Sequence, residues 1–331
     1  MCCAGSSESG RNNVAGARRN TLKLGTRGSP LALCQAGLVS ESLSRQWPGL
    51  EVSIIPIKTS GDKFLDVVLS QVGGKGLFVK EIEEALLDSR IDLAVHSLKD
   101  LPAELAPGLR EGAVMRREDP LDALIARSSL RFTDLPRGAR IGTSSLRRQV
   151  QFLHHRPDLQ IVSLRGNVQT RLKKLDELGL EAVVLAAAGL IRLGLQDRIT
   201  ERLQPDLCLP AIGQGALVIE IREDDQRTAE LVEPLNHRET RQATMAERAF
   251  LRRLGGSCVT PVAAFGEIEG EALVLTGMVA GLDGKRLLRH AVRGETGAPE
   301  RVGQALAEML LAAGADEILR EVNAQLLGQG Q

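Results

Sequence analysis

Short apolar segments alternate with amphipathic ones along the chain, and this alternation constrains the fold more than any other feature. Residues 139–143, 160–164 and 182–187 are short apolar runs, and the segments 146–155 and 168–178 between them have helical periodicity. Strands that alternate with helices form parallel sheets with helices on both faces. The pattern therefore predicts an α/β fold built on parallel sheets.

The N-terminal part of the chain shows the same alternation. We expect strands at 21–25, 52–57 and 91–95, and helices at 29–45 and 78–88. The α/β pattern thus begins close to the N-terminus and continues to about residue 187.

The pattern changes in the last third of the chain. Residues 213–223 predict one more strand, and residues 239–254 a helix that stops at two glycines. The remainder predicts a small α+β unit. Its expected elements are a strand near 272–280, a hairpin turn at 282–284, a strand near 286–292 and helices at about 298–313 and 316–327.

The composition argues against nucleic acid as a partner. The chain of 331 residues has a formal net charge of zero, and its aromatic residues are six Phe, one Trp and no Tyr. Single-stranded nucleic acid is bound by stacking bases on aromatic rings, and duplexes are bound by a positively charged surface. The scarcity of aromatic residues and the net charge of zero disfavour these two modes of binding, so we expect a small-molecule ligand instead.

The N-terminus and the cysteines bear on the compartment. Residues 1–20 are small, polar and basic, and we expect a disordered leader without a signal-peptide core. No apolar run approaches the ~18 residues of a membrane span. The five cysteines are scattered and form no C-x-x-C pair, which indicates neither a disulfide framework nor a metal site. We expect a cytoplasmic protein with no membrane partner and no metal.

One stretch concentrates positive charge. Residues 137–174 hold nine Lys or Arg side chains and a single acid, Asp158. Arginine binds carboxylate or phosphate through two parallel hydrogen bonds. Arg147, Arg148 and Arg165 each lie where a predicted strand gives way to a helix, a junction where backbone N–H groups meet anions. A solvated basic face is the alternative, but the placement at these junctions favours an anion-binding site.

A Lys-Asp pair follows a predicted buried strand. Residues 96–102 (HSLKDLP) come directly after the strand at 91–95, and ligands of open α/β sheets bind beyond the carboxyl ends of strands. Lys99 and Asp100 could form a surface ion pair of little energetic weight. Alternatively, the Asp100 carboxylate faces an arginine-lined cleft, where it stabilises a cation or accepts a hydrogen bond from an N–H group.

A glycine-rich segment at 73–78 (GGKGLF) opens a predicted helix. It lacks the G-K-[ST] ending of a P-loop, which disfavours a nucleotide site. We expect a glycine-rich turn or flap that leaves Lys75 available to a carboxylate.

Cys258 stands in a tight turn, at residues 255–261, that is bounded by glycines and a proline. Cysteine is most often a small buried residue, as we expect for Cys34 and Cys208. Exposure beside a cationic cleft would instead favour the reactive thiolate.

Several motifs, taken together and in this order, resemble one enzyme family. They are RGSPLA (27–32), HSLKDLP (96–102), GTSSLRR (142–148), LRGNV (164–168), AAGL (187–190), GQGAL (213–217) and AERAFL (246–251). The chain is similar to the porphobilinogen deaminases, also called hydroxymethylbilane synthases. The similarity runs from about Leu22 to the C-terminus and is strongest up to about Pro261.

The resemblance implies three domains. Two would be doubly wound α/β domains of the type II periplasmic-binding-protein kind with the active-site cleft between them, and the third a small α+β domain that carries the cofactor cysteine. After the leader at 1–20, we expect domain 1 at 21–117 and 213–236, domain 2 at 118–212 and domain 3 at 237–331.

The resemblance also implies the chemistry. One dipyrromethane cofactor would be joined to Cys258 through a thioether, and the substrate would be porphobilinogen. The enzyme, expected to be a monomeric transferase of tetrapyrrole and haem biosynthesis, would join four porphobilinogens head to tail with loss of ammonia and hydrolyse the chain to hydroxymethylbilane. Lys99 and Asp100 are the expected catalytic residues, with Asp100 stabilising the cation that loss of ammonia leaves.

The other expected site residues divide by ligand. Besides Cys258, Lys99 and Asp100, those expected to bind the cofactor are Ser97, Thr143, Ser144, Ser145, Arg147, Arg148, Arg165 and Gly166. Those expected to bind the substrate are Arg27, Ser29, Gln35, Lys75, Phe78, Arg171, Arg192 and Gln214.

Two other functions use some of the same features. A solute-binding module would share the two-lobed fold without chemistry, but we would then expect a signal peptide or a DNA-binding segment, and Cys258 would have no role. A phosphate- or nucleotide-binding enzyme is disfavoured because the sequence has neither a P-loop nor a G-x-G-x-x-G motif.

Overall fold

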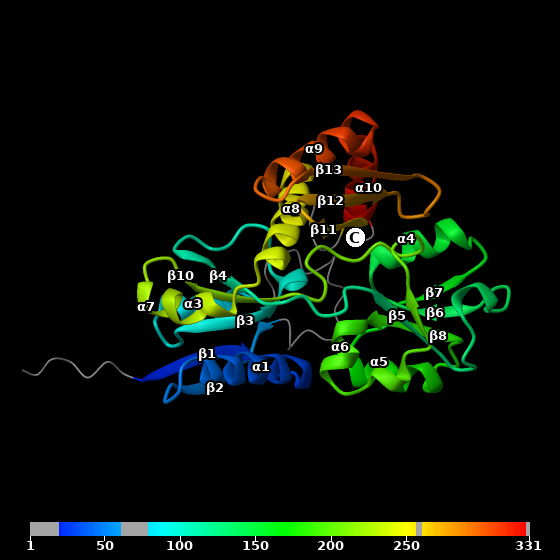
Figure 1. Cartoon of the computed structure of the whole chain (residues 1–331). Coiled ribbons are helices and arrows are strands. Elements are labelled where there is room, and N and C mark those ends of the chain that lie inside the picture. Colours follow the sequence, from blue (N-terminus) through cyan, green and yellow to red (C-terminus); the bar gives the residue numbers. More distant parts are fainter. Residues whose placement is uncertain (1–19, 61–78, 256–259, 329–331) are drawn as a thin grey trace, which may run out of the picture.

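The computed structural model describes residues 20–60, 79–255 and 260–328, which form three lobes, each built on one β-sheet (Figure 1). Two five-stranded sheets form the first and second lobes, and a three-stranded sheet forms the third. This confirms the expected combination of two α/β units with a small α+β unit. The expected leader lies outside the described residues except for Asn20.

The first lobe has the strand order β2-β1-β3-β10-β4, in which β1 is parallel to β2 and β3, and β10 is antiparallel to both of its neighbours. Its strands are β1 (Thr21–Arg27), β2 (Glu51–Ile57), β3 (Leu93–Ser97), β4 (Leu109–Val114) and β10 (Leu217–Arg222). Its helices are α1 (Pro30–Gln46), α3 (Lys80–Leu87) and α7 (Gln226–Val232). Helix α1 begins after Ser29, whose Oγ accepts a hydrogen bond from Ala32 N at 3.3 Å.

The second lobe has the order β7-β6-β8-β5-β9, in which β6 is parallel to β7 and β8, and β5 is antiparallel to both of its neighbours. Its strands are β5 (Asp122–Ala126), β6 (Arg140–Gly142), β7 (Gln160–Val162), β8 (Ala182–Ala186) and β9 (Glu201–Leu203). Its helices are α4 (Leu146–His155), α5 (Val168–Glu177) and α6 (Ala187–Arg192). Asn167 caps α5 by accepting a hydrogen bond from Thr170 N at 2.9 Å.

Both sheets are mixed, which corrects the expectation of parallel sheets. The antiparallel strands β5 and β10 are each the first strand that the chain enters after it passes from one five-stranded sheet to the other. Each of them enters its sheet from the other lobe rather than after a crossover helix packed on its own sheet, so the geometry of a βαβ unit does not make it parallel to its neighbours. The sequence pattern also misses β4, β5, β9 and β11, because these strands are short or interrupted by glycine and charged residues.

The two segments that pass between the sheets, 115–121 and 204–216, pair with each other. Glu118 N donates a hydrogen bond to Gly215 O at 3.2 Å. Gly215 has a φ of 90°, and a Cβ atom at this position would overlap the carbonyl oxygen of Glu118. The close approach of these two crossing segments therefore requires glycine.

We expect Gly215→Ala to lower the free energy of unfolding by ~3 kcal/mol or more, because it combines a positive φ with overpacking against backbone. Gly194→Ala is the matched control: Gly194 has a φ of 67° but open space around the added methyl group. It should cost only ~1 kcal/mol. Urea unfolding measures both variants, and equal losses would show that the crossing segments separate without penalty.

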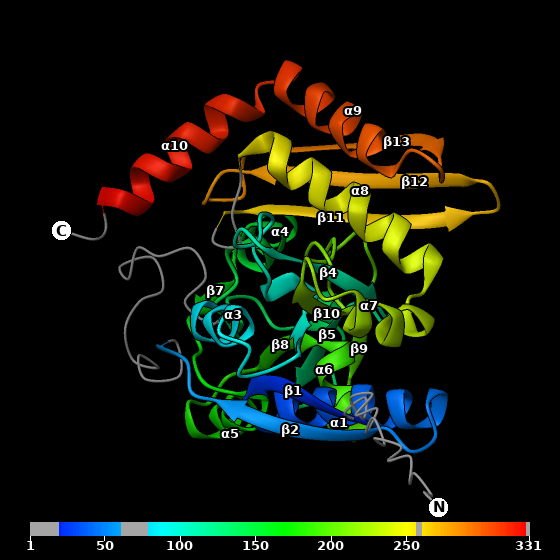
Figure 2. The same ribbon diagram turned by 90° about the vertical axis from the view of Figure 1, so that its left-hand side faces the viewer.

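The third lobe is an antiparallel sheet with the order β11-β12-β13. Its strands are β11 (Val262–Glu269), β12 (Ala272–Ala280) and β13 (Leu287–Glu295), and its helices are α8 (Arg238–Leu254), α9 (Pro299–Ala312) and α10 (Ala315–Gly328). Helix α8 packs on β11 and β12, and α9 packs on β12 and β13 (Figure 2). Phe250, Leu275 and Leu306 belong to the core between them.

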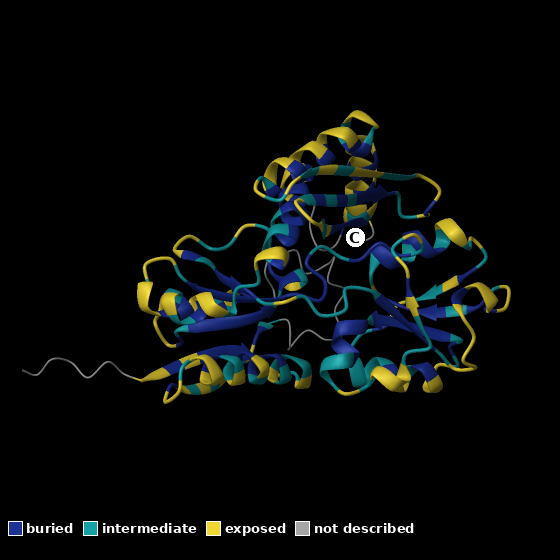
Figure 3. Ribbon diagram, viewed as in Figure 1, coloured by how far each residue is buried: buried dark blue, intermediate teal, exposed yellow. Residues whose placement is uncertain are grey.

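The third lobe is attached to both of the others. Val150 of α4 and Leu209 of the second crossing segment pack with Met278 of β12. Arg248 of α8 donates to the carbonyl oxygen of Pro102 at 2.6 Å, in the loop that follows β3. Buried residues run along the sheets and into these junctions, whereas exposed residues lie on the outer turns of the helices, on loops and along the strands β2 and β13 (Figure 3). The third lobe thus contacts both other lobes and packs against the second of the two segments that cross between them.

No helix in the described part of the chain combines the length and the apolar character needed to cross a membrane.

Candidate active site

Asp100 stands at the end of a short turn beyond β3. Strand β3 ends at Ser97, and a 3-10 turn of Leu98–Asp100 follows. Leu98 is 1% exposed, and its N–H donates to Ala216 O at 3.0 Å. The turn is thereby anchored to the second crossing segment, with Lys99 half-buried and Asp100 exposed.

The Lys99 ammonium lies among charges from both α/β lobes. Burial lowers the pKa of Lys99 to about 8, an effect that Asp100 opposes and Arg148 of the second lobe increases. Lys99 Nζ also donates a hydrogen bond to Gln214 Oε1 at 3.2 Å. The Gln214 Nε2 atom in turn donates to Asp122 Oδ1 at 3.0 Å.

Arg147 and Arg148, at the start of α4, converge on Asp122, the first residue of β5. Arg147 Nη1 donates to Asp122 Oδ2 at 2.7 Å, and Arg148 Nη2 donates to Asp122 Oδ1 at 2.6 Å. Both arginines are 5% exposed and Asp122 is 0% exposed. Burial alone would raise the pKa of Asp122, but the two guanidinium groups hold it well below its usual range.

The two arginines also donate hydrogen bonds to backbone carbonyl oxygens. Arg147 Nη1 also donates to Leu209 O at 2.7 Å, and Arg148 Nη1 donates to Val184 O at 2.9 Å. The structure thus places both guanidinium groups against the protein itself. That they bind a cofactor carboxylate stays a prediction.

The turn before α5 supplies the next group of cations. Arg165 and Gly166 form this turn, in which Gly166 has a φ of 108°, and Arg171 Nε donates to Gly166 O at 2.9 Å. Burial lowers the pKa of Arg171, Arg148 lowers it further, and Asp100 raises it. Asp100 of the first lobe and Arg171 of the second therefore lie within electrostatic reach of each other.

We call the residues gathered at this boundary the interlobe site. They are Lys99, Asp100, Asp122, Arg147, Arg148, Arg171 and Gln214.

Residues 143–145, which connect β6 to α4, carry three hydroxyl groups beside this site. Ser145 N donates to Thr143 Oγ1 at 3.2 Å, and Ser144 Oγ donates to Leu164 O. Thr143 is buried, Ser144 is exposed and Ser145 is between the two. The segment precedes the first turn of α4, where backbone N–H groups lack helical partners and favour anions.

A second set of predicted residues lies where α1 meets α6. Cys34 Sγ donates to Arg192 O at 2.9 Å, and Arg192 Nη2 donates to Gly215 O at 2.6 Å. Gln35 Nε2 donates to Ser97 Oγ at 2.9 Å. These bonds connect α1, the end of β3, α6 and the second crossing segment. Burial lowers the pKa of Arg192.

Two family models match the chain. The model described as porphobilinogen deaminase, dipyromethane cofactor binding domain, covers residues 22–230, and the porphobilinogen deaminase C-terminal domain covers residues 241–312. The porphobilinogen deaminase of Syntrophotalea carbinolica is 56% identical over 300 residues, which are 91% of this chain and 95% of that protein. That of Geotalea uraniireducens is 55% identical over 302 residues, with the same coverage. The chain belongs to the porphobilinogen deaminase family.

Solved structures resemble the chain at low identity. The probable amino-acid ABC transporter extracellular-binding protein ytmK from Bacillus subtilis has a TM-score of 0.39 at 12% identity, over 65% of this chain and 89% of that one. The Bordetella pertussis BvgS VFT2 domain has a TM-score of 0.39 at 15% identity, over 70% and 91%.

The expected porphobilinogen deaminase residues occupy two neighbouring positions. Ser97, Lys99, Asp100, Arg171 and Gln214 meet at or next to the interlobe site. Arg27 ends β1, and Ser29 caps α1, the helix that contacts α6. Three expected residues lie outside the described part of the chain: Lys75, Phe78 and Cys258.

Sequence reasoning misses three charged residues of this porphobilinogen deaminase family member: Asp122 and Glu247, which are 0% exposed, and Arg117, whose side chain is 11% exposed. Asp122 is one, and its position at the head of the apolar run DALIA is a signal that could have identified it. The others form an ion pair in which Arg117 Nη1 lies 2.6 Å from Glu247 Oε1. Glu247 also accepts from Gly213 N at 2.6 Å, so it fixes both crossing segments to α8. Residues 130 positions apart offer no local sign of such a pair.

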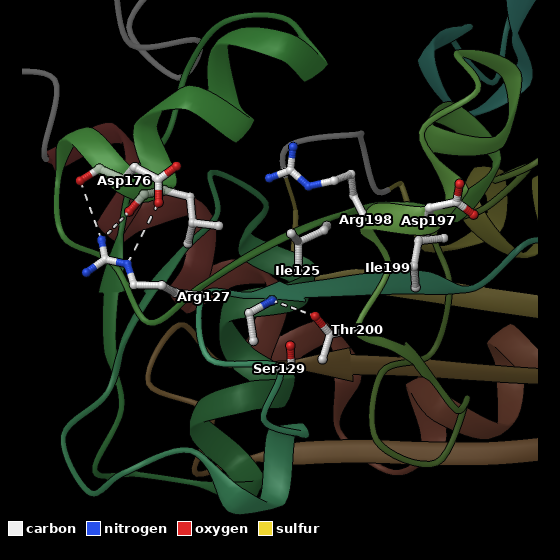
Figure 4. Close-up of a pocket in the computed structure, with 10 residues that line it drawn as sticks. Ile125, Arg127, Ser129, Asp176, Asp197, Arg198, Ile199 and Thr200 are labelled. Carbon is white, nitrogen blue, oxygen red and sulfur yellow. Dashed lines mark hydrogen bonds and ion pairs between the residues drawn. The ribbon is translucent and has the colours of Figure 1, made fainter.

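A separate cavity lies on the second lobe (Figure 4). Its volume is about 470 Å³, and its lining includes Arg127, Asp176, Arg198 and Thr200. Arg127 Nε lies 3.9 Å from Asp176 Oδ1. None of the residues expected to bind cofactor or substrate lines this cavity.

Within the described ranges, no group of three or more His, Cys, Asp or Glu residues is arranged to hold a metal ion.

Proposed function

We propose that this chain catalyses the porphobilinogen deaminase reaction. It joins four porphobilinogens head to tail, starting from a dipyrromethane held by Cys258, releases ammonia at each addition and frees the product by hydrolysis as hydroxymethylbilane. The observation that carries the proposal is the interlobe site, where exposed Asp100 lies beside Lys99 and within electrostatic reach of Arg171. Family membership supports the choice of substrate.

The residue types match what the substrate presents. Each porphobilinogen has two carboxylates and a pyrrole N–H, and it becomes a cation when ammonia leaves. Asp100 accepts from the N–H group and stabilises the cation, because a carboxylate opposes developing positive charge. The carboxylates are held by charge-assisted hydrogen bonds. We assign these bonds to Lys99, Arg27, Arg165, Arg171 and Arg192, with Lys75, Ser29, Gln35 and Phe78 completing the substrate contacts.

The described residues also fit the cofactor. A dipyrromethane carries carboxylates and pyrrole N–H groups, so it needs cationic donors together with one acceptor. We assign the cationic donors Arg147, Arg148 and Arg165, the hydroxyl groups of residues 143–145 and the acceptor Asp100 to it. When bound, it supplies the pyrrole to which the first substrate ring is joined.

We infer three domains, at 21–117 with 213–236, at 118–212 and at 237–331. Support comes from sheet membership, because β1–β4 and β10 share one sheet, β5–β9 a second and β11–β13 a third. We also propose that this transferase is monomeric and cytoplasmic.

Intact-mass spectrometry of the full-length protein tests the proposed function. We expect a covalent adduct with the mass of two linked pyrrole units, and heavier species that differ by single pyrrole units after brief exposure to porphobilinogen. A protein that carries no adduct and binds an anionic solute reversibly would be a solute-binding module instead.

Lys99 leads to an expected pH dependence. Its ammonium is charged below its pKa of about 8 and neutral above it, whereas carboxylates of the substrate stay ionised throughout this range. We expect the KM for porphobilinogen to rise as the pH increases through about 8, by up to ~10-fold, the order of one charge-assisted hydrogen bond.

Lys99→Arg is the matched control, because a guanidinium group keeps its charge over this range. Its KM should show no rise through the same pH interval, whatever its absolute value. An identical rise in both proteins would assign the titration to another group.

A further inference from the structure

Asp122 is a buried acceptor shared by several side chains. It takes hydrogen bonds from Arg147, Arg148, Gln214 and Cys208, the last from Sγ to Oδ2 at 3.2 Å. Its carboxylate is 0% exposed, so it cannot touch a ligand directly. Any effect of Asp122 on a ligand must therefore pass through these partners.

The two arginines are consecutive in sequence, which makes their convergence informative. Neighbouring positions on a helix point in different directions, and two guanidinium groups repel each other. Arg147 and Arg148 nonetheless meet at one carboxylate, at 2.7 and 2.6 Å. Asp122 is the group that compensates their repulsion and fixes where both point.

Gln214 extends this arrangement across the lobe boundary. Its Nε2 donates to Asp122 Oδ1 at 3.0 Å and to Pro120 O at 2.7 Å, and its Oε1 accepts from Lys99 Nζ at 3.2 Å. Asp122 belongs to the second lobe and Lys99 to the first, while Gln214 lies on a crossing segment. One hydrogen-bonded chain therefore runs from Lys99 through Gln214 and Asp122 to the two arginines.

We propose that Asp122 is a positioning residue for cofactor assembly: it fixes Arg147 and Arg148 directly and Lys99 through Gln214, so that donors from both lobes meet the carboxylates of one dipyrromethane in a single arrangement. This inference rests on the proposed function. It assigns a role to a residue that the motifs do not indicate, and it makes Gln214 the connection between the lobes.

The competing explanation is that Asp122 only stabilises the fold. A buried carboxylate paired with two arginines costs several kcal/mol to disrupt even where no ligand is involved. The test therefore needs a variant that weakens the same buried region without altering this chain. Gln151 serves as that control: it is 3% exposed, and its Nε2 donates to Arg147 O and Leu209 O at 3.0 and 3.2 Å.

The experiment compares full-length wild type, Asp122→Asn, Gln214→Met and Gln151→Met, each produced in cells that make no porphobilinogen. Porphobilinogen is then added, and intact-mass spectrometry follows the rate at which the dipyrromethane adduct forms. Thermal unfolding of each protein before the addition gives its stability.

We expect Asp122→Asn and Gln214→Met to form the adduct ~10-fold or more slowly, the order expected when a charge-assisted hydrogen bond is lost. Gln151→Met should load at the wild-type rate despite a lowered Tm. If Asp122→Asn does not fold, Gln214→Met decides, because it leaves both arginine pairs of Asp122 in place.

Two outcomes would overturn the inference. The first is that Asp122→Asn forms the adduct at the wild-type rate or, where that variant does not fold, that Gln214→Met does. The second is that Gln151→Met forms the adduct as slowly as the other two variants, because the effect would then come from lowered stability alone. Failure of the proposed function looks different, because the wild-type protein itself would then acquire no adduct.

Discussion

Replacing Asp100 with asparagine is expected to lower kcat by ~10²-fold or more, the order observed when a group that stabilises developing charge is removed. Asparagine keeps the size of the side chain and removes the charge opposite the cation left by loss of ammonia. Because Asp100 is exposed, its replacement should change the free energy of unfolding by no more than ~0.5 kcal/mol. Single-turnover kinetics with porphobilinogen measures the effect, and the adduct should persist because the arginines remain.

Glu104→Gln is the matched control for this charge change. Glu104 is an exposed carboxylate four positions further along the same loop, and removing its charge should leave turnover unchanged. Near-normal turnover in Asp100→Asn would contradict the proposed role of the aspartate. A comparable loss of turnover in Glu104→Gln would show instead that removing any negative charge from this loop lowers activity.

Cys258→Ser should yield protein without the dipyrromethane adduct and without turnover. A hydroxyl group has a far higher pKa than a thiol, so serine provides no nucleophile comparable to a thiolate near neutral pH. Intact mass determines the presence of the adduct, and assay with porphobilinogen determines the loss of activity.

Cys34→Ser is the control for general effects of losing a thiol. Cys34 Sγ donates a hydrogen bond to Arg192 O at 2.9 Å, and a serine hydroxyl can donate in its place. This variant should keep the adduct and turn over normally. An adduct found on any cysteine other than Cys258 would contradict the proposal that Cys258 holds the dipyrromethane, and with it the proposed role of the third domain.

Much of the secondary structure follows from local pattern. Helix α4 has the bounds Leu146–His155 and strand β12 the bounds Ala272–Ala280, both as the sequence predicts. The pattern does not identify β5 at all. It identifies β10 but not its direction, because periodicity locates a strand but does not show from which sheet the chain arrives. The expected parallel sheets are therefore mixed.

The candidate site shows the same division. The sequence places the HSLKDLP run directly after a buried strand, and Asp100 does lie in the turn that follows β3. The basic stretch correctly indicates arginines at strand-to-helix junctions. It does not indicate that Arg147 and Arg148 are buried against Asp122, which lies 25 and 26 positions away in sequence.

The sequence alone determined the alternation of elements, the family and the residue types that suit a polyanionic ligand, because these depend on local periodicity and on motifs of adjacent residues. Only the tertiary structure decided which charges meet. The Lys99–Gln214–Asp122 chain joins two lobes through a crossing segment, and Glu247 joins both crossing segments to α8. Such contacts depend on how separate sheets pack, and the energy of a buried charge is set by its neighbours in space rather than in sequence.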